Sequence, residues 1–223
     1  MKITSALRAI KVALVASVLV GPGTFVSVAS RAQETGPSEV EAREGFVSLF
    51  NGKDFQGWRF GESDPASGTL PPNWKVEDGV IKLSGGNSPH LASQREFADF
   101  DVRLQWRAMR DKYNSGFFIR SGRNVGANQI NLSQSAVGKL MSGGQGGDAV
   151  PKLQKPVGEW NDWRVLAVGD RVTFWCNGER AWEVVGFKDR RGYLGLQAEG
   201  APMEFRNIRI KELGAGDAGA EKK

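Results

Sequence analysis

The sequence predicts an all-β protein built as an antiparallel sandwich or barrel. Short segments in which apolar and polar residues alternate are separated by turn residues, and no stretch after residue 32 keeps the apolar period of a helix. The chain has 29 glycines among its 223 residues, roughly twice the average share of ~7%. This excess suits a fold in which tight turns join many strands.

Hairpin turns mark the strands most clearly. Asn-Gly and Asp-Gly favour two-residue hairpins because both central positions of such a turn take a positive φ. Three turn dipeptides lie between alternating arms: Asp78-Gly79, Gly169-Asp170 and Asn177-Gly178. They predict a hairpin over 74–83 and three successive strands over 163–184. Four further alternating segments complete the set of expected strands: 97–109, 115–120, 193–199 and 204–213.

Residues 1–32 have the composition of a signal peptide. Lys2, Arg8 and Lys11 precede nine apolar residues, Val12–Val20, and small residues lead to a cleavage site near Ala32. A membrane anchor is the alternative, but nine residues make only about half of a bilayer span. We therefore expect export to the periplasm or the medium, with no membrane span after cleavage.

The remaining chain divides by composition. Residues 33–44 are polar and acidic and predict a linker, and residues 214–223 are small and polar and predict a disordered tail. The single folded domain is expected over 45–213. Because residues 1–32 hold four basic and no acidic residues, 26 basic and 25 acidic residues remain. A balance so close to neutral gives no support for nucleic-acid binding.

Several standard chemistries are not supported by the residues present. His90 is the only histidine and Cys176 the only cysteine, so neither a Ser–His–acid triad nor a zinc site rich in histidine or thiolate is expected. No strand places two acids at i and i+2 on its polar face, as a pair of glycosidase carboxylates would suggest. No cofactor is indicated with certainty. A divalent cation held by oxygen ligands stays open.

The polar faces of the predicted strands carry amides, guanidinium groups and one carboxylate, which suit the hydroxyls of a sugar. An ordinary solvated face is the alternative for each strand taken singly. Tryptophans beside loops could add a stacking platform, whereas Trp106 and Trp163 are expected in the core. The polar candidates are Arg107, Asn114, Arg120, Gln129, Gln197 and Glu199, and the tryptophan candidates are Trp58, Trp74 and Trp160.

Seven segments in fixed order resemble the 3-keto-disaccharide hydrolase family. They are "GFVSLFNGKDFQGW" (45–58), "WKVEDGVIKL" (74–83), "FADFDVRLQWR" (97–107), "NSGFFIR" (114–120), "KPVGEWNDWRV" (155–165), "CNGERAWEV" (176–184) and "GLQAEGAPMEFRNIRIKEL" (195–213). The resemblance implies a concanavalin-like jelly-roll sandwich in an exported bacterial protein that acts on oxidised sugars.

The implied chemistry needs one base instead of two acids. A ketone at C3 acidifies the hydrogen at C2, so that a base can form an enolate and the glycosidic oxygen can leave from C1 before water adds. Within this scheme Glu199 is the candidate base, and Arg107 and Arg120, expected on neighbouring faces, are candidate enolate stabilisers. Asn114, Gln129 and Gln197 are expected to bind hydroxyls.

Three functions remain open at this level. An exported enzyme that cleaves glycosidic bonds of 3-keto-sugars is the first, and the sequence does not separate hydrolysis from elimination alone. A non-catalytic carbohydrate-binding module on the same sandwich is the second, and an interaction module of the cell envelope is the third. The partner in the first two is a di- or oligosaccharide or glycoside.

Overall fold

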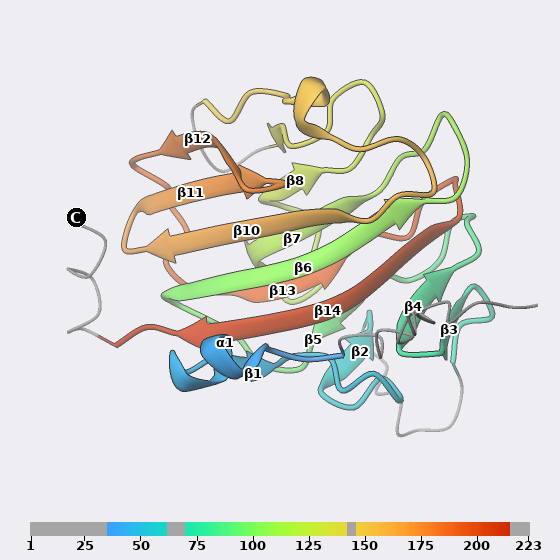
Figure 1. Cartoon of the computed structure of the whole chain (residues 1–223), viewed down its shortest axis with the longest axis horizontal. Helices are drawn as coiled ribbons and strands as arrows, with labels where there is room; N and C mark the ends of the chain where they lie inside the picture. Colours follow the sequence, from blue (N-terminus) through green and yellow to red (C-terminus); the bar gives the residue numbers. More distant parts are fainter. Residues whose placement is uncertain (1–34, 62–69, 142–145, 215–223) are drawn as a thin grey trace, which may run out of the picture. The chain divides into compact units, whose positions relative to one another are not determined.

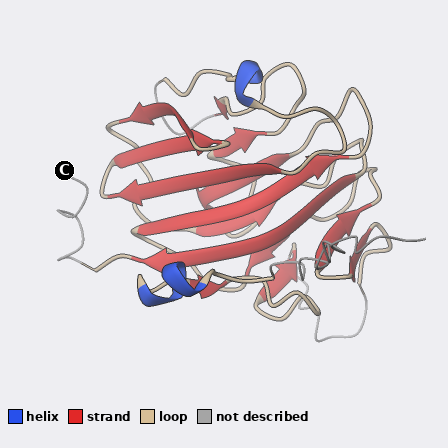
Figure 2. Cartoon of the chain, viewed as in Figure 1, coloured by secondary structure: helices blue, strands red, loops and turns tan. Residues whose placement is uncertain are grey.

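The computed structural model describes residues 35–61, 70–141 and 146–214, which lie in one compact unit, Gln33–Lys223. Strands dominate this unit (Figures 1 and 2). They form two sheets, and every strand pairing in both sheets is antiparallel. The prediction of an all-β antiparallel sandwich is therefore confirmed.

The first sheet has eight strands in the order β12-β11-β10-β6-β14-β4-β3, with β1 also paired to β14. Its strands are β1 (Val47–Ser48), β3 (Trp74–Glu77), β4 (Val80–Leu83), β6 (Phe100–Ala108), β10 (Asn161–Val168), β11 (Arg171–Cys176), β12 (Glu179–Val184) and β14 (Met203–Glu212).

The second sheet has six strands in the order β2-β5-β13-β7-β8-β9. Its strands are β2 (Trp58–Phe60), β5 (Leu91–Ser93), β7 (Gly116–Ser121), β8 (Gln129–Asn131), β9 (Leu140–Met141) and β13 (Tyr193–Leu196). The described residues also form two short helices, α1 (Glu39–Arg43) and the 3-10 helix η2 (Pro151–Leu153).

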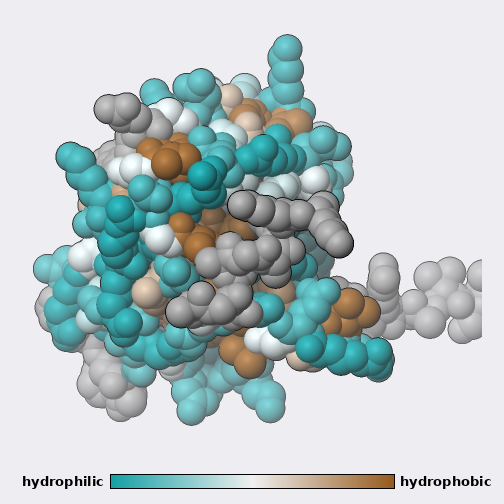
Figure 3. Space-filling model, turned by 90° about the vertical axis from the view of Figure 1, so that its left-hand side faces the viewer, coloured by the Kyte–Doolittle hydropathy of each residue, from teal (hydrophilic) through white to brown (hydrophobic). Residues whose placement is uncertain are grey.

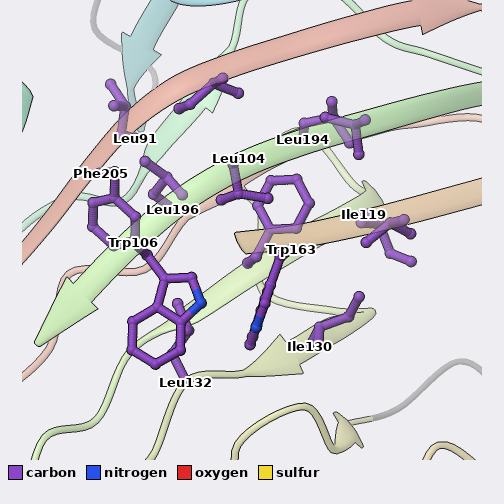
Figure 4. Close-up of a cluster of buried hydrophobic side chains, with 14 of the residues drawn as sticks. Leu91, Leu104, Trp106, Ile119, Ile130, Leu132, Trp163, Leu194, Leu196 and Phe205 are labelled. Atoms are coloured by element: carbon purple, nitrogen blue, oxygen red, sulfur yellow. The ribbon is translucent and has the colours of Figure 1, made fainter. Parts of the chain in front are cut away.

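One face of each sheet packs against the other sheet to form the core (Figure 4). On β10 every second residue is buried from Asn161 onward, and β6 shows the same alternation after Val102, as the two-residue period of a strand requires. Trp106 and Trp163 are each 1% exposed and meet edge to face with ring centroids 5.5 Å apart. Their predicted place in the core is confirmed, and truncation of either to alanine would cost about 3–5 kcal/mol.

The predicted hairpins are present. Asp78-Gly79 joins β3 to β4 and Asn177-Gly178 joins β11 to β12, and all four residues have positive φ. This matches the twist that a two-residue hairpin needs. The three strands expected over 163–184 are β10, β11 and β12.

The segment assigned to a polar linker, 33–44, contains a docked helix. Ser38 and Glu41 form a reciprocal capping box at the start of α1. Glu41 Oε1 then accepts hydrogen bonds from Arg103 Nη1 and Arg209 Nε, both at 2.9 Å, so α1 is fixed to β6 and β14. Composition did not reveal this because the acids of α1 find their partners on strands far along the chain.

The surface seen from the end where β6 begins is mainly hydrophilic, with small separate hydrophobic groups (Figure 3). No helix within the described ranges is long and apolar enough to cross a bilayer.

Replacement of Glu41 by glutamine should destabilise the fold at pH 7 by about 1–3 kcal/mol, because it removes the carboxylate that Arg209 and Arg103 share and leaves Arg103 only its pair with Asp101. Burial by itself raises the pKa of Glu41, but hydrogen bonds from Ser38 N–H, Arg209 and Arg103 outweigh it and hold the pKa below its usual value. A lowered folded-state pKa stabilises the fold above the unfolded-state value and loses this effect as the pH falls.

Urea unfolding at pH 7 and at pH 3 measures this. The difference between wild type and Glu41→Gln should be large at pH 7 and shrink at pH 3. An equal difference at the two pH values would contradict the assignment.

Candidate active site

The outer face of the six-stranded sheet gathers the amides predicted from the sequence. On β13 Leu194 and Leu196 belong to the core cluster, so Gly195 and the following Gln197 face outward. On β8 Ile130 is in the core, and Gln129 faces outward and is half-buried. Strand β7 lies between β8 and β13 and separates the two glutamines.

Gly116 on β7 lets these two glutamines meet. Gln129 Nε2 donates to Gln197 Oε1 at 2.6 Å and to Ser115 O at 3.3 Å. A Cβ at Gly116 would lie 1.8 Å from Gln129 Nε2, so the Gln129 amide crosses β7 directly over this glycine. The contact orients the Gln197 amide and leaves its NH₂ group as a donor to a ligand on this face.

His90 precedes β5 and joins the same face. Its imidazole lies over Phe118, with ring centroids 5.3 Å apart, and Nδ1 accepts a hydrogen bond from Ala198 N–H at 3.2 Å. Because Nδ1 is the acceptor, the proton of the neutral ring is on Nε2. Burial lowers the pKa of His90, and the nearby Glu199 carboxylate opposes this only in part. The ring is therefore a neutral donor at pH 7.

Sequence analysis set His90 aside as a lone histidine. Nothing in the local sequence "NSPHLAS" indicates a role, because the residue that holds its ring, Ala198, lies 108 positions along the chain. The pairing of Leu91 with Leu196 brings His90 beside Gln197. Glu199, the predicted base, follows β13 on the same side and is half-buried. Asn114, the remaining predicted amide, precedes β7 and is also half-buried.

Arg120 has a structural place instead of the predicted catalytic one. Its side chain is 0% exposed and its Nη2 pairs with Asp99 Oδ1 at 2.8 Å. Its other nitrogens donate to three backbone carbonyls, those of Ala98, Gly169 and Asp189. One guanidinium thus ties together three loops at the end of the sandwich.

A β-bulge explains why alternation misplaced Arg120. Phe118 pairs with Gly195 but Ser121 pairs with Tyr193, so β7 holds one residue more than β13 over this stretch. Arg120 takes a φ of +43° there. A bulge of this kind re-aims a side chain, and Arg120 no longer shares the face of Phe118.

The expectation that Arg107 and Arg120 lie on neighbouring faces was wrong. Arg107 is on β6 of the eight-stranded sheet, whereas Arg120 is on β7 of the other sheet. Arg107 Nε donates to Glu204 at 2.7 Å, and its guanidinium lies 4.5 Å from the Trp160 ring. Arg206 lies 3.9 Å from the same ring. Trp160 therefore stacks with two arginines of the eight-stranded sheet and does not lie on the face that carries Glu199.

The other tryptophan candidates are core residues. Trp58 is 0% exposed and donates its indole N–H to Leu49 O at 2.9 Å. Trp74 is 2% exposed and donates to Pro89 O at 3.0 Å. Neither can present a ring face to a sugar, so the predicted tryptophan platform is absent from these positions.

A separate hollow of about 340 Å³ opens at one end of the sandwich. Tyr113 donates to Gln154 there, and burial raises the pKa of Tyr113 to about 12. Other polar groups of the hollow also bond to nearby residues: Gln134 Nε2 donates to Asp111, and Gln134 Oε1 accepts from Lys112 N–H. The hollow is lined by Asp111, Tyr113, Gln134, Pro151, Gln154, Lys155, Pro156 and Val157.

The described residues offer few ligands to a divalent cation. Within them no three His, Cys, Asp or Glu side chains come together. The outer face supplies one carboxylate, Glu199, and one imidazole, His90, whereas Ca²⁺ usually takes six to eight oxygen ligands.

Comparison with known proteins assigns the chain to a family. Residues 45–211 match the model of a family described as the 3-keto-alpha-glucoside-1,2-lyase-like domain. The chain belongs to this family. The family resemblance found in the sequence is therefore confirmed.

A relative found by sequence supports the same membership. The 3-keto-disaccharide hydrolase of Bacteroides thetaiotaomicron is 24% identical over 234 residues, which cover 76% of this chain and 79% of the relative. This extent includes most of the lyase-like domain.

Solved structures share the fold of the lyase-like domain. A protein from Parabacteroides distasonis, assigned provisionally to the glycosyl hydrolases, has a TM-score of 0.64 at 24% identity and covers 81% of this chain and 99% of its own. Carbohydrate-binding module CBM66 from Bacillus subtilis has a TM-score of 0.52 at 12% identity and covers 70% of this chain and 96% of its own. At these identities the likeness extends to the sandwich alone.

Replacement of Arg120 by methionine should lower the free energy of unfolding by about 3–5 kcal/mol, because it removes the buried guanidinium that pairs with Asp99 and donates to three backbone carbonyls. Arg43→Met is the matched control, since the Arg43 side chain is 79% exposed and its replacement should change stability by less than about 0.5 kcal/mol. Chemical unfolding measures both. Equal stability of the two variants would contradict the structural role of Arg120.

Proposed function

We propose that this protein is an enzyme that cleaves the glycosidic bond of 3-keto-glycosides on the outer face of the six-stranded sheet. The observation that carries the proposal is the convergence of Glu199, His90 and the Gln129–Gln197 pair on this face, in a chain of the 3-keto-alpha-glucoside-1,2-lyase-like family. One carboxylate with neutral donors beside it suits a reaction that begins with removal of a carbon-bound proton.

The proposed reaction is an elimination followed by addition of water. Glu199 removes the proton from C2, and the electrons of that bond form the enolate with the C3 carbonyl. Collapse of the enolate forms the C1–C2 double bond and expels the glycosidic oxygen, which takes up the proton held by Glu199. Water that adds at C1 gives the 3-keto-sugar. The family description as a 1,2-lyase supports the first half of this sequence.

His90 and Gln197 take the role first assigned to the arginines. The enolate oxygen needs donors that are already oriented before charge develops on it. Ala198 N–H fixes the His90 tautomer with its proton on Nε2, and Gln129 fixes the amide of Gln197. Two neutral donors stabilise a developing negative charge without a permanent cation that would hold Glu199 in an ion pair.

The face also has the means to bind hydroxyls. Asn114 and Asn131 supply half-buried amides beside Gly116, and Gly116 pairs with Asn131 across the ladder. Planar amides bind vicinal hydroxyls in pairs because each has a donor and an acceptor side by side. This supports a di- or oligosaccharide or glycoside as the ligand. We include in this proposal export of the protein through residues 1–32, to the periplasm or the medium.

Replacement of Glu199 by glutamine should lower kcat for a chromogenic 3-keto-glucoside by about 10²–10⁴-fold, because the amide cannot accept the C2 proton. Glu39→Gln is the matched control, since the Glu39 side chain is 91% exposed on α1 and its replacement should leave kcat within about twofold of wild type. Release of the leaving group is measured with and without added Mn²⁺ or Ca²⁺. Saccharide binding without turnover by wild type would instead support the carbohydrate-binding module.

His90→Gln should lower kcat by about 10²-fold at pH 7, because glutamine keeps an acceptor for Ala198 N–H but removes the imidazole donor. Since burial lowers the pKa of His90, wild-type activity should fall only as the pH drops below the ordinary value of 6.5. Protonation of Nδ1 then breaks its bond to Ala198 N–H. The pH profile of kcat should lose this step in His90→Gln, and a step that persists unchanged would contradict the role of His90.

A further inference from the structure

The outer face of the six-stranded sheet is closed beside the candidate site by the loop 122–128, which joins β7 to β8. Val125 in this loop is 4% exposed and packs in a cluster with Ala92, Phe118 and Tyr193. These residues lie on β5, β7 and β13, so the loop folds back across the middle of the sheet. A surface loop places a valine there only if the sheet provides a matching recess.

Small residues on the sheet make that recess. A Cβ added to Gly195 would lie 3.1 Å from Val125 Cγ1, so the glycine leaves the space that the valine fills. Ala92 pairs with Gly195 across the ladder and is fully buried. An alanine at position 195 would already crowd Val125, so the glycine belongs to the fit between the loop and the sheet.

The loop is held at both of its ends. Ser121 Oγ accepts from the N–H groups of Gly126 and Ala127 at 3.1 and 3.2 Å. Asn128 Nδ2 donates to Asp189 Oδ2 at 2.7 Å. Arg59, whose guanidinium lies 4.6 Å from the Tyr193 ring, donates to the carbonyl of Arg123. The covering of the sheet by Val125 is therefore a built feature of the fold.

Backbone strain points the same way. Val125 has a φ of +28°, which is an outlier for a β-branched residue. Such a conformation costs about 1–3 kcal/mol and persists only where the surroundings impose it. A glycine would adopt this conformation with less strain, but it could not fill the recess over Gly195.

We propose that the loop 122–128, anchored to the sheet by Val125, limits the length of the substrate by closing one end of the candidate site. This inference rests on the proposed function. Gly195 on β13 and Gln197, which directly follows this strand, are two residues apart, which is about 6.6 Å in extended chain. A sugar ring bound beside Gln197 therefore meets the loop 122–128, which the buried Val125 anchors to the sheet, and no further ring fits on the sheet in that direction. The site takes a ring at or next to the end of a chain and rejects rings inside a polysaccharide.

The test compares a 3-keto-disaccharide with two trisaccharides that extend it by one residue, one on the oxidised ring and one on the leaving group. Wild type should cleave the disaccharide, and for one trisaccharide kcat/KM should fall at least about tenfold, because the added ring meets the loop 122–128 that Val125 anchors. Val125→Gly should restore most of that loss and leave kcat/KM for the disaccharide within about twofold.

Asn124→Ala is the matched control, because Asn124 lies in the same loop with its side chain exposed and should behave as wild type. Thermal unfolding of each variant verifies the fold, and saccharide binding by calorimetry gives a second readout. Wild type that cleaves all three substrates equally, or Val125→Gly that gains nothing on the rejected trisaccharide, would overturn the length limit and leave the proposed function intact. If no 3-keto-glycoside is cleaved, the proposed function fails, and the length limit fails with it.

Discussion

Burial of one face of each sheet against the other is the constraint on which this structure depends. Once Leu194 and Leu196 are fixed in the core, the strand leaves Gly195 and Gln197 no direction but outward. The same rule applied to β8 sends Gln129 to the same surface. The chemistry of the outer face is thus a consequence of hydrophobic packing on the inner one, which stabilises the fold by roughly 25 cal/mol for each Å² of apolar surface buried.

Two glycines on this sheet matter for the side chains they omit. Gly116 gives the amide of Gln129 a path across β7, and Gly195 gives Val125 a recess on β13. At Gly116 the missing Cβ allows a contact between two amide side chains, and at Gly195 it leaves space for the side chain of Val125. A side chain at position 116 would stand where the Gln129 amide crosses to Gln197, and a side chain at position 195 would crowd Val125.

The site that results differs from the one drawn from the sequence in its cationic part. Membership of the 3-keto-alpha-glucoside-1,2-lyase-like family is shown over 45–211, and the amides and the carboxylate lie together as expected. The two arginines do not. Arg107 neutralises Glu204 on the opposite sheet, and Arg120 holds three loops from inside the fold. The proposed chemistry then relies on neutral donors, and His90 becomes its central residue.

The sequence by itself determined the longer strands, the hairpins and the family, because these follow from local alternation, from turn residues with positive φ and from segments in fixed order. The short strands β1, β2, β5 and β9 were not among those expected. It also placed Gln129, Gln197 and Glu199 on outward faces. Only the tertiary structure decided which sheet each strand joins, where the bulge turns Arg120 inward, and that Ala198 holds His90 from 108 positions away. Periodicity records which side of its own strand a residue takes. Which strands share a sheet, and where one of them gains an extra residue, depends on contacts between segments that are distant in the chain.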